Sequence, residues 1–314
     1  MTSTSPGAPQ RIFVTGATGA VGIHVVPLLL AQRHVVTAVG RTAEKRARLE
    51  SIGARGVAFD AFDAAAARRS LEGQNAVINL ATHMPDTTMQ MLLPWRWREN
   101  DTVRREGSAA LARAARDVGV SLFMQESFAP AYEDGGDQWI DEGWPQRPAP
   151  YNRTILDAER SAARFTEEGG EGIVLRFASF YGPDQFLRDA IGTVRKGWSP
   201  LPGAPRAYWS SIAHEDAATA VVALLSAPTG VYNVCDDAPV TRREWVGSLA
   251  ASIGAKPPRS IPRLLSALGG KTTELLSRSQ RMSNAKLKAA TGWTPKWPTA
   301  TEGLPAAVRE LTRR

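Results

Sequence analysis

The 314-residue sequence has a single cysteine, Cys235, and no long apolar run. One cysteine cannot form an internal disulfide or a CxxC metal or redox site, and its isolation favours a reducing compartment. The longest apolar stretch, residues 20–31, is interrupted by glycine, histidine and proline, so it falls short of the ~18 apolar residues that a membrane-spanning helix needs. Residues 1–10 carry neither the basic start nor the apolar segment of a signal peptide. We therefore expect a cytoplasmic protein without a membrane partner.

The sequence also lacks histidines spaced as metal ligands and a continuous run of basic and aromatic residues that would bind nucleic acid. None of its four histidines pairs with another at the spacing of metal ligands, so no metal site is expected. The net charge is +7, but the cations are spread along predicted helices without interleaved aromatic residues. They gather only at Arg41, Lys45, Arg46 and Arg48, after a predicted strand. We therefore predict a pocket for an anionic small molecule and no nucleic-acid partner.

Hydrophobic residues make up 43% and charged residues 22% of the chain, close to globular averages, so a packed core is expected. Short apolar runs alternate with segments of helical periodicity, which predicts an α/β fold with a Rossmann-type, doubly wound parallel sheet. The expected strands span residues 12–15, 35–40, 56–59, 76–81, 121–125, 172–177 and 230–234. The expected helices span residues 21–32, 42–52, 64–71, 100–118, 151–165 and 214–226.

The composition of the sequence changes after Phe177, where prolines and aromatic residues become frequent. We predict a flexible stretch at residues 1–10 and a Rossmann domain at 11–178. A helix and a strand from about 210–235 return to that domain. Residues 179–209 and 236–314 are predicted to form a smaller, interleaved substrate-binding domain.

The most informative segment is residues 11–22, where a short strand runs directly into three glycines spaced three apart. Glycine permits the tight turn, lets backbone N–H groups approach a pyrophosphate, and allows close packing of helix on strand. The pyrophosphate then lies at the positive end of the following helix. The segment predicts a nucleotide site at Gly16, Thr18, Gly19, Ala20, Val21 and Gly22. The alternative is an ordinary turn between a strand and a helix.

The residue after the second predicted strand indicates which nucleotide binds. An NAD site carries Asp or Glu near this position for the ribose 2′-hydroxyl, whereas an Arg accommodates the 2′-phosphate of NADP. The sequence has Arg41 there, which predicts NADP(H) as the cofactor. Asp60 and Asp63 follow the third predicted strand, near the expected adenine. Alternatively, both cap the next helix.

With its TGATGAVG glycine motif, the chain resembles the extended short-chain dehydrogenase/reductase superfamily, the NAD(P)-dependent epimerase/dehydratase group. The resemblance covers approximately residues 11–304. It implies that Ala81 and Thr82, after the fourth strand, flank the cofactor ribose and nicotinamide. It also implies that the segments beginning at Tyr181 and His214 form the substrate side of the site, and it is compatible with a homodimer.

The resemblance places Tyr151 at the tyrosine of the family's Tyr-x-x-x-Lys motif, with Glu159 following as expected. Ile155 stands at the lysine position. A lysine there would lower the pKa of the tyrosine and hold the ribose hydroxyls, and isoleucine can do neither.

The serine position of the family has two interpretations here. Counting back from Tyr132 puts Phe128 at the catalytic position, and a shift of one residue restores Ser127 to it. The alternative role for Ser127 is a cap. Glu126, a carboxylate just past a buried strand, could have a raised pKa and act as an acid or base.

Apolar and aromatic residues indicate the substrate wall. Residues 83–98 carry three Met and two Trp directly after the fourth strand, which predicts a mobile apolar lid for a hydrophobic or aromatic substrate. The alternatives are a helix start or a dimer contact. Its members His83 and Trp95 are expected to contact substrate, as are Tyr181 and Trp209.

Together these features predict an NADP(H)-dependent oxidoreductase acting on a carbonyl or alcohol of a small, fairly apolar molecule. Tyr151 would donate the proton, assisted by Ser127. One alternative is a redox-neutral epimerase, isomerase, dehydratase or cyclase on the same scaffold, in which Glu126 is the better acid or base. Another alternative is a non-catalytic NADP-binding sensor, as loss of the lysine would permit.

Overall fold

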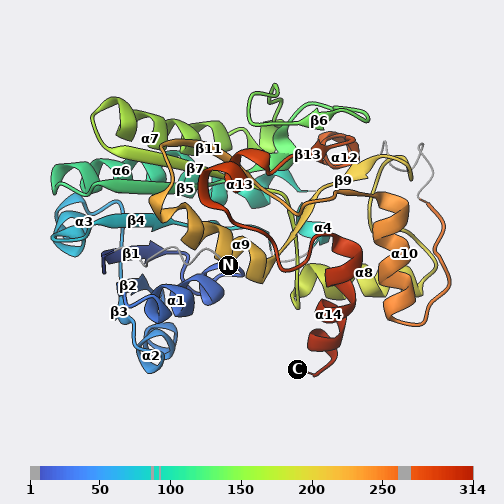
Figure 1. Cartoon of the computed structure of the whole chain (residues 1–314), viewed down its shortest axis with the longest axis horizontal. Helices are drawn as coiled ribbons and strands as arrows, with labels where there is room; N and C mark the ends of the chain where they lie inside the picture. Colours follow the sequence, from blue (N-terminus) through green and yellow to red (C-terminus); the bar gives the residue numbers. More distant parts are fainter. Residues whose placement is uncertain (1–7, 86–87, 92, 261–269, 314) are drawn as a thin grey trace.

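The computed structural model describes residues 8–85, 88–91, 93–260 and 270–313 (Figure 1). Its centre is a seven-stranded sheet in the order β11-β7-β5-β4-β1-β2-β3, in which all neighbouring strands are parallel. This confirms the predicted Rossmann-type α/β fold. The strands are β1 (Arg11–Thr15), β2 (Val35–Val39), β3 (Arg55–Val57), β4 (Ala76–Asn79), β5 (Leu122–Phe128), β7 (Glu171–Phe177) and β11 (Gly230–Val234).

Helices cover both faces of the sheet, so its central strands are buried on both sides, as parallel strands require. On one face α1 (Gly22–Ala31) packs against α9 (His214–Ala223). On the other face α6 (Ser108–Asp117) packs between α3 (Ala64–Leu71) and α7 (Ile155–Glu167). Successive strand residues alternate between the two cores: Val14, Ile78, Met124 and Leu175 lie in the first, and Phe13, Val77, Phe123 and Val174 in the second.

A third core lies beyond the sheet, where α8 (Gln185–Arg195), α10 (Arg242–Ser252) and α14 (Ala300–Arg313) stand together at the right of Figure 1. Trp245, Leu249 and Leu304 are fully buried there. Outside the main sheet, the described residues also form three two-stranded pairings: β8 (Ser179–Tyr181) with β10 (Ser211–Ala213), β9 (Tyr208–Trp209) with β12 (Val240–Thr241), and β6 (Trp139–Ile140) with β13 (Arg281–Met282). Further helices in the described residues are α2 (Ala43–Ser51), which packs on β3, α4 (Thr88–Met91), α12 (Gly270–Ser277) and α13 (Ala285–Thr291).

Several predicted boundaries were wrong, and two of the differences bear on the site. The helix expected at 100–118 begins earlier, as α5 (Arg98–Thr102), and continues through a π-helical turn (Val103–Gly107) into α6. The helix expected from Tyr151 begins at Ile155, after a 3₁₀ turn at Pro150–Asn152. The flexible stretch expected at residues 1–10 lies outside the described residues as far as residue 7.

Candidate cofactor and active site

The turn between β1 and α1 fits a group that needs close approach to the backbone. Gly16 has a φ of 65°, and a Cβ there would lie 2.4 Å from the carbonyl oxygen of Leu80. A Cβ on Gly22 would lie 2.2 Å from the carbonyl oxygen of Gly16, which accepts from Gly19 N at 2.9 Å. Both glycines are therefore required by the backbone itself. Thr18 is half-buried, Gly19 and Ala20 are exposed, and Val21 is buried.

Arg41 follows β2 at the same edge of the sheet and is exposed. One of its guanidinium nitrogens lies 3.5 Å from Nδ1 of His83, which in turn lies 3.1 Å from a carboxylate oxygen of Glu99. The structure thus brings His83 to the Arg41 side of the site. Asp60 accepts from the backbone N–H of Phe62 at 2.9 Å. Asp63 caps α3 by accepting from Ala66 N at 3.0 Å, as the alternative interpretation of Asp63 expected.

Buried amides tie together the carboxyl ends of the three central strands. Asn79, the last residue of β4, accepts from the Thr15 hydroxyl on β1. Its amide donates to Gln125 Oε1 on β5 at 2.8 Å and to the Ser108 hydroxyl on α6 at 3.3 Å. Asn79 therefore fixes the place from which the half-buried residues Ala81 and Thr82 start.

The hydroxyl of Ser127, near the end of β5, donates to Glu159 of α7 at 2.6 Å. Glu159 also receives two hydrogen bonds from Arg176, at 2.8 and 2.7 Å. Burial opposes the charge on Arg176, but these bonds outweigh it and raise the pKa of the guanidinium. Because its proton is committed to Glu159, Ser127 cannot at the same time donate to a substrate oxygen.

Glu126, the neighbouring residue on β5, forms a buried ion pair with Arg104 of the π-helical turn. Arg104 donates through Nε to Oε1 at 2.9 Å and through Nη2 to Oε2 at 3.1 Å. The side chains are only 4% and 10% exposed. Two parallel bonds to one carboxylate are a strong and orientation-specific contact.

Tyr151 lies in the 3₁₀ turn before α7 and is half-buried. Its ring contacts that of Trp97, with centroids 4.8 Å apart. Trp97 is itself buried and donates from Nε1 to the carbonyl of Met91 at 3.0 Å. Ile155, the first residue of α7, is fully buried. The site therefore pairs a tyrosine with an indole, and an aliphatic residue begins the helix that follows.

The comparisons with known proteins agree with this geometry. Residues 12–235 match the NAD-dependent epimerase/dehydratase family. The chain belongs to this family. Its resemblance to the extended short-chain dehydrogenases is thereby confirmed, and the family consists of NAD-dependent enzymes.

Two relatives of this epimerase/dehydratase-family chain are named as reductases. A 3-diazoavenalumate denitrifying reductase from a Streptomyces species is 30% identical over 94% of this chain and 99% of its own length. A 4-hydroxy-2-methyl-3-oxo-4-farnesyl-3,4-dihydroquinoline-1-oxide ketoreductase from Stigmatella aurantiaca is 27% identical, over 79% of this chain and 74% of its own. The human epimerase family protein SDR39U1 with NADPH shares the fold at 20% identity, with a TM-score of 0.77 over 96% of this chain and all of that one.

The four predicted substrate residues are dispersed in the family fold. His83 lies beside Arg41, as described, and Trp95 is 58% exposed. Tyr181 is fully buried in the third core, where burial raises the pKa of its hydroxyl. Trp209 packs in the same core, under the guanidinium of Arg242. Residues 86, 87 and 92 of the predicted lid lie outside the described residues.

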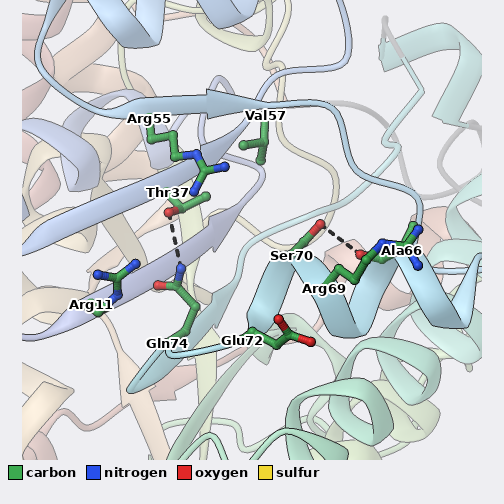
Figure 2. A pocket seen from close by; sticks show the side chains of 9 residues that line it. All are labelled: Arg11, Thr37, Arg55, Val57, Ala66, Arg69, Ser70, Glu72 and Gln74. Atoms are coloured by element: carbon green, nitrogen blue, oxygen red, sulfur yellow. Dashed lines mark hydrogen bonds between the residues drawn. The ribbon is translucent and has the colours of Figure 1, made fainter.

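A cavity of about 280 Å³ lies away from this edge of the sheet, on the face covered by α3 (Figure 2). Its lining runs from Arg11, the first residue of β1, past Thr37 within β2 to the short strand β3, so this cavity lies beside the outer strands and not beyond the carboxyl ends of β1 and β4. Ligands of doubly wound sheets bind outside the carboxyl ends. We therefore do not assign the cofactor to it. Its lining comprises Arg11, Thr37, Arg55, Val57, Ala66, Arg69, Ser70, Glu72 and Gln74.

Two further findings concern the described part of the chain. It contains no group of three or more His, Cys, Asp or Glu side chains arranged to hold a metal ion. No helix in it is long and apolar enough to cross a membrane.

Sequence reasoning missed Trp97 and Arg104. The predicted lid contains both Trp95 and Trp97, and its pattern gave no reason to prefer the buried one. Arg104 is 22 residues away from its partner Glu126 in the sequence. It lies in a segment that the sequence pattern predicts to be one regular helix. The available signal was an arginine on the apolar side of that helix.

Proposed function

We propose that this chain is an NADP(H)-dependent oxidoreductase that acts on a carbonyl or another hydride-accepting group of a small, fairly apolar molecule. The observation that carries the proposal is the glycine turn, whose backbone leaves no room for side chains at Gly16 and Gly22. Arg41 follows β2 where an NAD site would have an acid. The names of both reductase relatives support the direction of the reaction.

The residues of the turn fit the nucleotide. Gly19 and Ala20, exposed just before α1, would let the pyrophosphate approach the amino end of that helix. Arg41 would bind the 2′-phosphate through charge-assisted hydrogen bonds. When bound, the reduced nicotinamide supplies a hydride to the substrate. We also propose that Asp60 borders the adenine and that Ala81 and Thr82 border the nicotinamide half.

Tyr151 is the proposed proton donor, and its surroundings restrict the substrate. Ile155 provides no positive charge to favour the tyrosinate, and the Ser127 proton is engaged by Glu159. Such a site suits substrates whose reduction needs no acid beyond Tyr151. The name of the Streptomyces relative refers to a diazo compound and to denitrification. We infer an electron-poor, apolar or aromatic substrate, which suits the rings of Trp97 and Tyr151.

The cofactor proposal is tested by binding. We expect the wild-type protein to bind NADPH more tightly than NADH, because hydrogen bonds to a charged group contribute about 1.5–3 kcal/mol. Arg41→Asp should remove or reverse this preference. Arg55→Ala is the control, since Arg55 is also exposed but lies at the amino end of β3. An unchanged preference in Arg41→Asp would refute the role of Arg41.

A further inference from the structure

The ion pair between Arg104 and Glu126 has no role in the function proposed above. Both side chains are almost completely buried, and desolvating two charges costs about as much free energy as their attraction returns. A buried pair is therefore weak evidence for a stabilising device. Arg104 also lies on a π-helical turn, a distortion that is often found at functional sites. Its position in the fold indicates what the pair does.

Glu126 lies just beyond the point where β4 ends. Asn79, the last residue of β4, is opposite Gln125, and beyond it β5 continues to Phe128 against β7 alone. Leu80, the residue after β4, contacts the glycine turn. Adjacent strands lie about 4.8 Å apart, so β5 is ~10 Å from β1 across β4. The pair thus lies two strands from the glycine turn, at the same edge of the sheet.

The direction in which a bound dinucleotide would extend across the sheet also points to Glu126. A dinucleotide binds across the point where the strand order reverses, which here is between β1 and β4. The adenosine ribose is read at the end of β2, on the β1 side. The nicotinamide half then extends over β4 and β5, toward Glu126.

We propose that the Arg104–Glu126 pair holds the ribose of the nicotinamide half, the task that Ile155 cannot perform. This inference rests on the proposed function. An ionised carboxylate offers about four acceptor sites, and the two bonds from Arg104 leave the others for ribose hydroxyls. The guanidinium fixes the orientation of the carboxylate and neutralises it, so the ribose meets a pair without net charge. Glu126 is a binding residue and Arg104 a positioning residue.

The π-helical turn and α7 explain why the pair can take this place. The turn at Val103–Gly107 packs against α7, whose first residue is Ile155. A cation that would otherwise come from α7 is here supplied from the adjacent turn. Because Ile155 is fully buried, that part of α7 serves packing instead.

The test compares ligands that contain and lack the nicotinamide half. NADPH is titrated against wild type and against the double variant Arg104→Met/Glu126→Gln, which removes both charges and leaves neither unpaired. Adenosine 2′,5′-bisphosphate, which lacks the nicotinamide ribose, is titrated in parallel. We expect the double variant to bind NADPH about tenfold more weakly, since hydrogen bonds to charged groups are strong, and the bisphosphate equally well. NADH and ADP form a second ligand pair.

Two further variants separate binding from folding. Arg104→Lys keeps the charge but cannot make the two-bond contact, so we expect an intermediate loss for NADPH alone. Glu274→Gln is the matched control, because Glu274 holds the buried Arg278 by the same two-bond geometry, at 3.2 and 3.0 Å. We expect it to change thermal unfolding without distinguishing the two ligands.

The outcomes are distinct. Wild-type protein that binds neither ligand pair would overturn both the proposed function and this inference. If wild type binds NADPH and the double variant binds NADPH with the same affinity as wild type, only the role of the pair is overturned. The same holds if the double variant loses affinity for NADPH and for the bisphosphate by the same factor.

Discussion

Gly16 is the residue at which the cofactor turn can be tested most sharply. It has a φ of 65°, in the left-handed region, and a Cβ there would lie 2.4 Å from the oxygen and 2.5 Å from the carbon of the Leu80 carbonyl. Both atoms belong to the backbone, so no side-chain rotation relieves the contact. Gly16→Ala must therefore displace the turn, the start of α1 or the segment after β4.

The expected loss of stability has two parts. A left-handed conformation costs a residue with a Cβ about 1–2 kcal/mol, and overpacking adds about 1–3 kcal/mol, which gives about 2–5 kcal/mol in total. Gly119 provides the matched control, with a φ of 77° and nothing within 4 Å of its added Cβ. Gly119→Ala should therefore lose only the first part, about 1–2 kcal/mol.

Urea unfolding of the three proteins measures the free energies, and titration with NADPH measures cofactor affinity. We expect Gly16→Ala to be the less stable variant and to bind NADPH far more weakly. Gly119→Ala should bind NADPH as wild type does. If both variants lose the same stability and bind NADPH alike, the contact with Leu80 does not shape a cofactor site.

Three further predictions follow from individual side chains. Burial raises the pKa of Asp236 well above its ordinary value of 3.8, so its contribution to stability is present at low pH and is lost as the pH rises toward the folded pKa. Asp236→Asn should thus gain stability over wild type as the pH rises above 3.8, by at most about 1.4 kcal/mol per pH unit; a difference in unfolding temperature between the two proteins that does not change with pH would contradict this. Ser127→Ala should lose about 2 kcal/mol in urea unfolding, because it removes a hydrogen bond to the charged Glu159, while NADPH affinity stays unchanged; a weakened affinity would mean that Ser127 contacts the cofactor. Tyr151→Phe should lower the rate of NADPH oxidation with any accepted substrate about 100-fold, and an unchanged rate would remove Tyr151 from the chemistry.

The fold was largely predictable because its strands are buried on both faces. Runs such as Ile12–Val14 are apolar throughout, and Gly230–Val234 is apolar except for Asn233; the structure has strands at both places. The polar end of β5 was missed, since Glu126 and Ser127 do not look like strand residues. They belong to the strand because Arg104 and Glu159, distant in sequence, satisfy their side chains.

The site was predictable where one segment determines the geometry, and unpredictable where two segments must meet. The glycine turn is local, and the backbone contacts of Gly16 and Gly22 agree with its motif. Trp95 and Trp97 are both tryptophans of one short segment, but Trp95 is exposed and Trp97 is buried. Only the packing of Trp97 against Tyr151 distinguishes them. The ion pair of Arg104 crosses from a helical turn to a strand, and no local pattern encodes it.

The most direct test of the proposed function follows NADPH and product together. Purified protein is incubated with NADPH and a panel of apolar aromatic ketones and diazo compounds, and the reduced-nicotinamide absorbance is recorded while product is quantified. We predict that one NADPH is consumed for each molecule of product. Product that forms while the absorbance stays constant would contradict an oxidoreductase and favour a redox-neutral reaction.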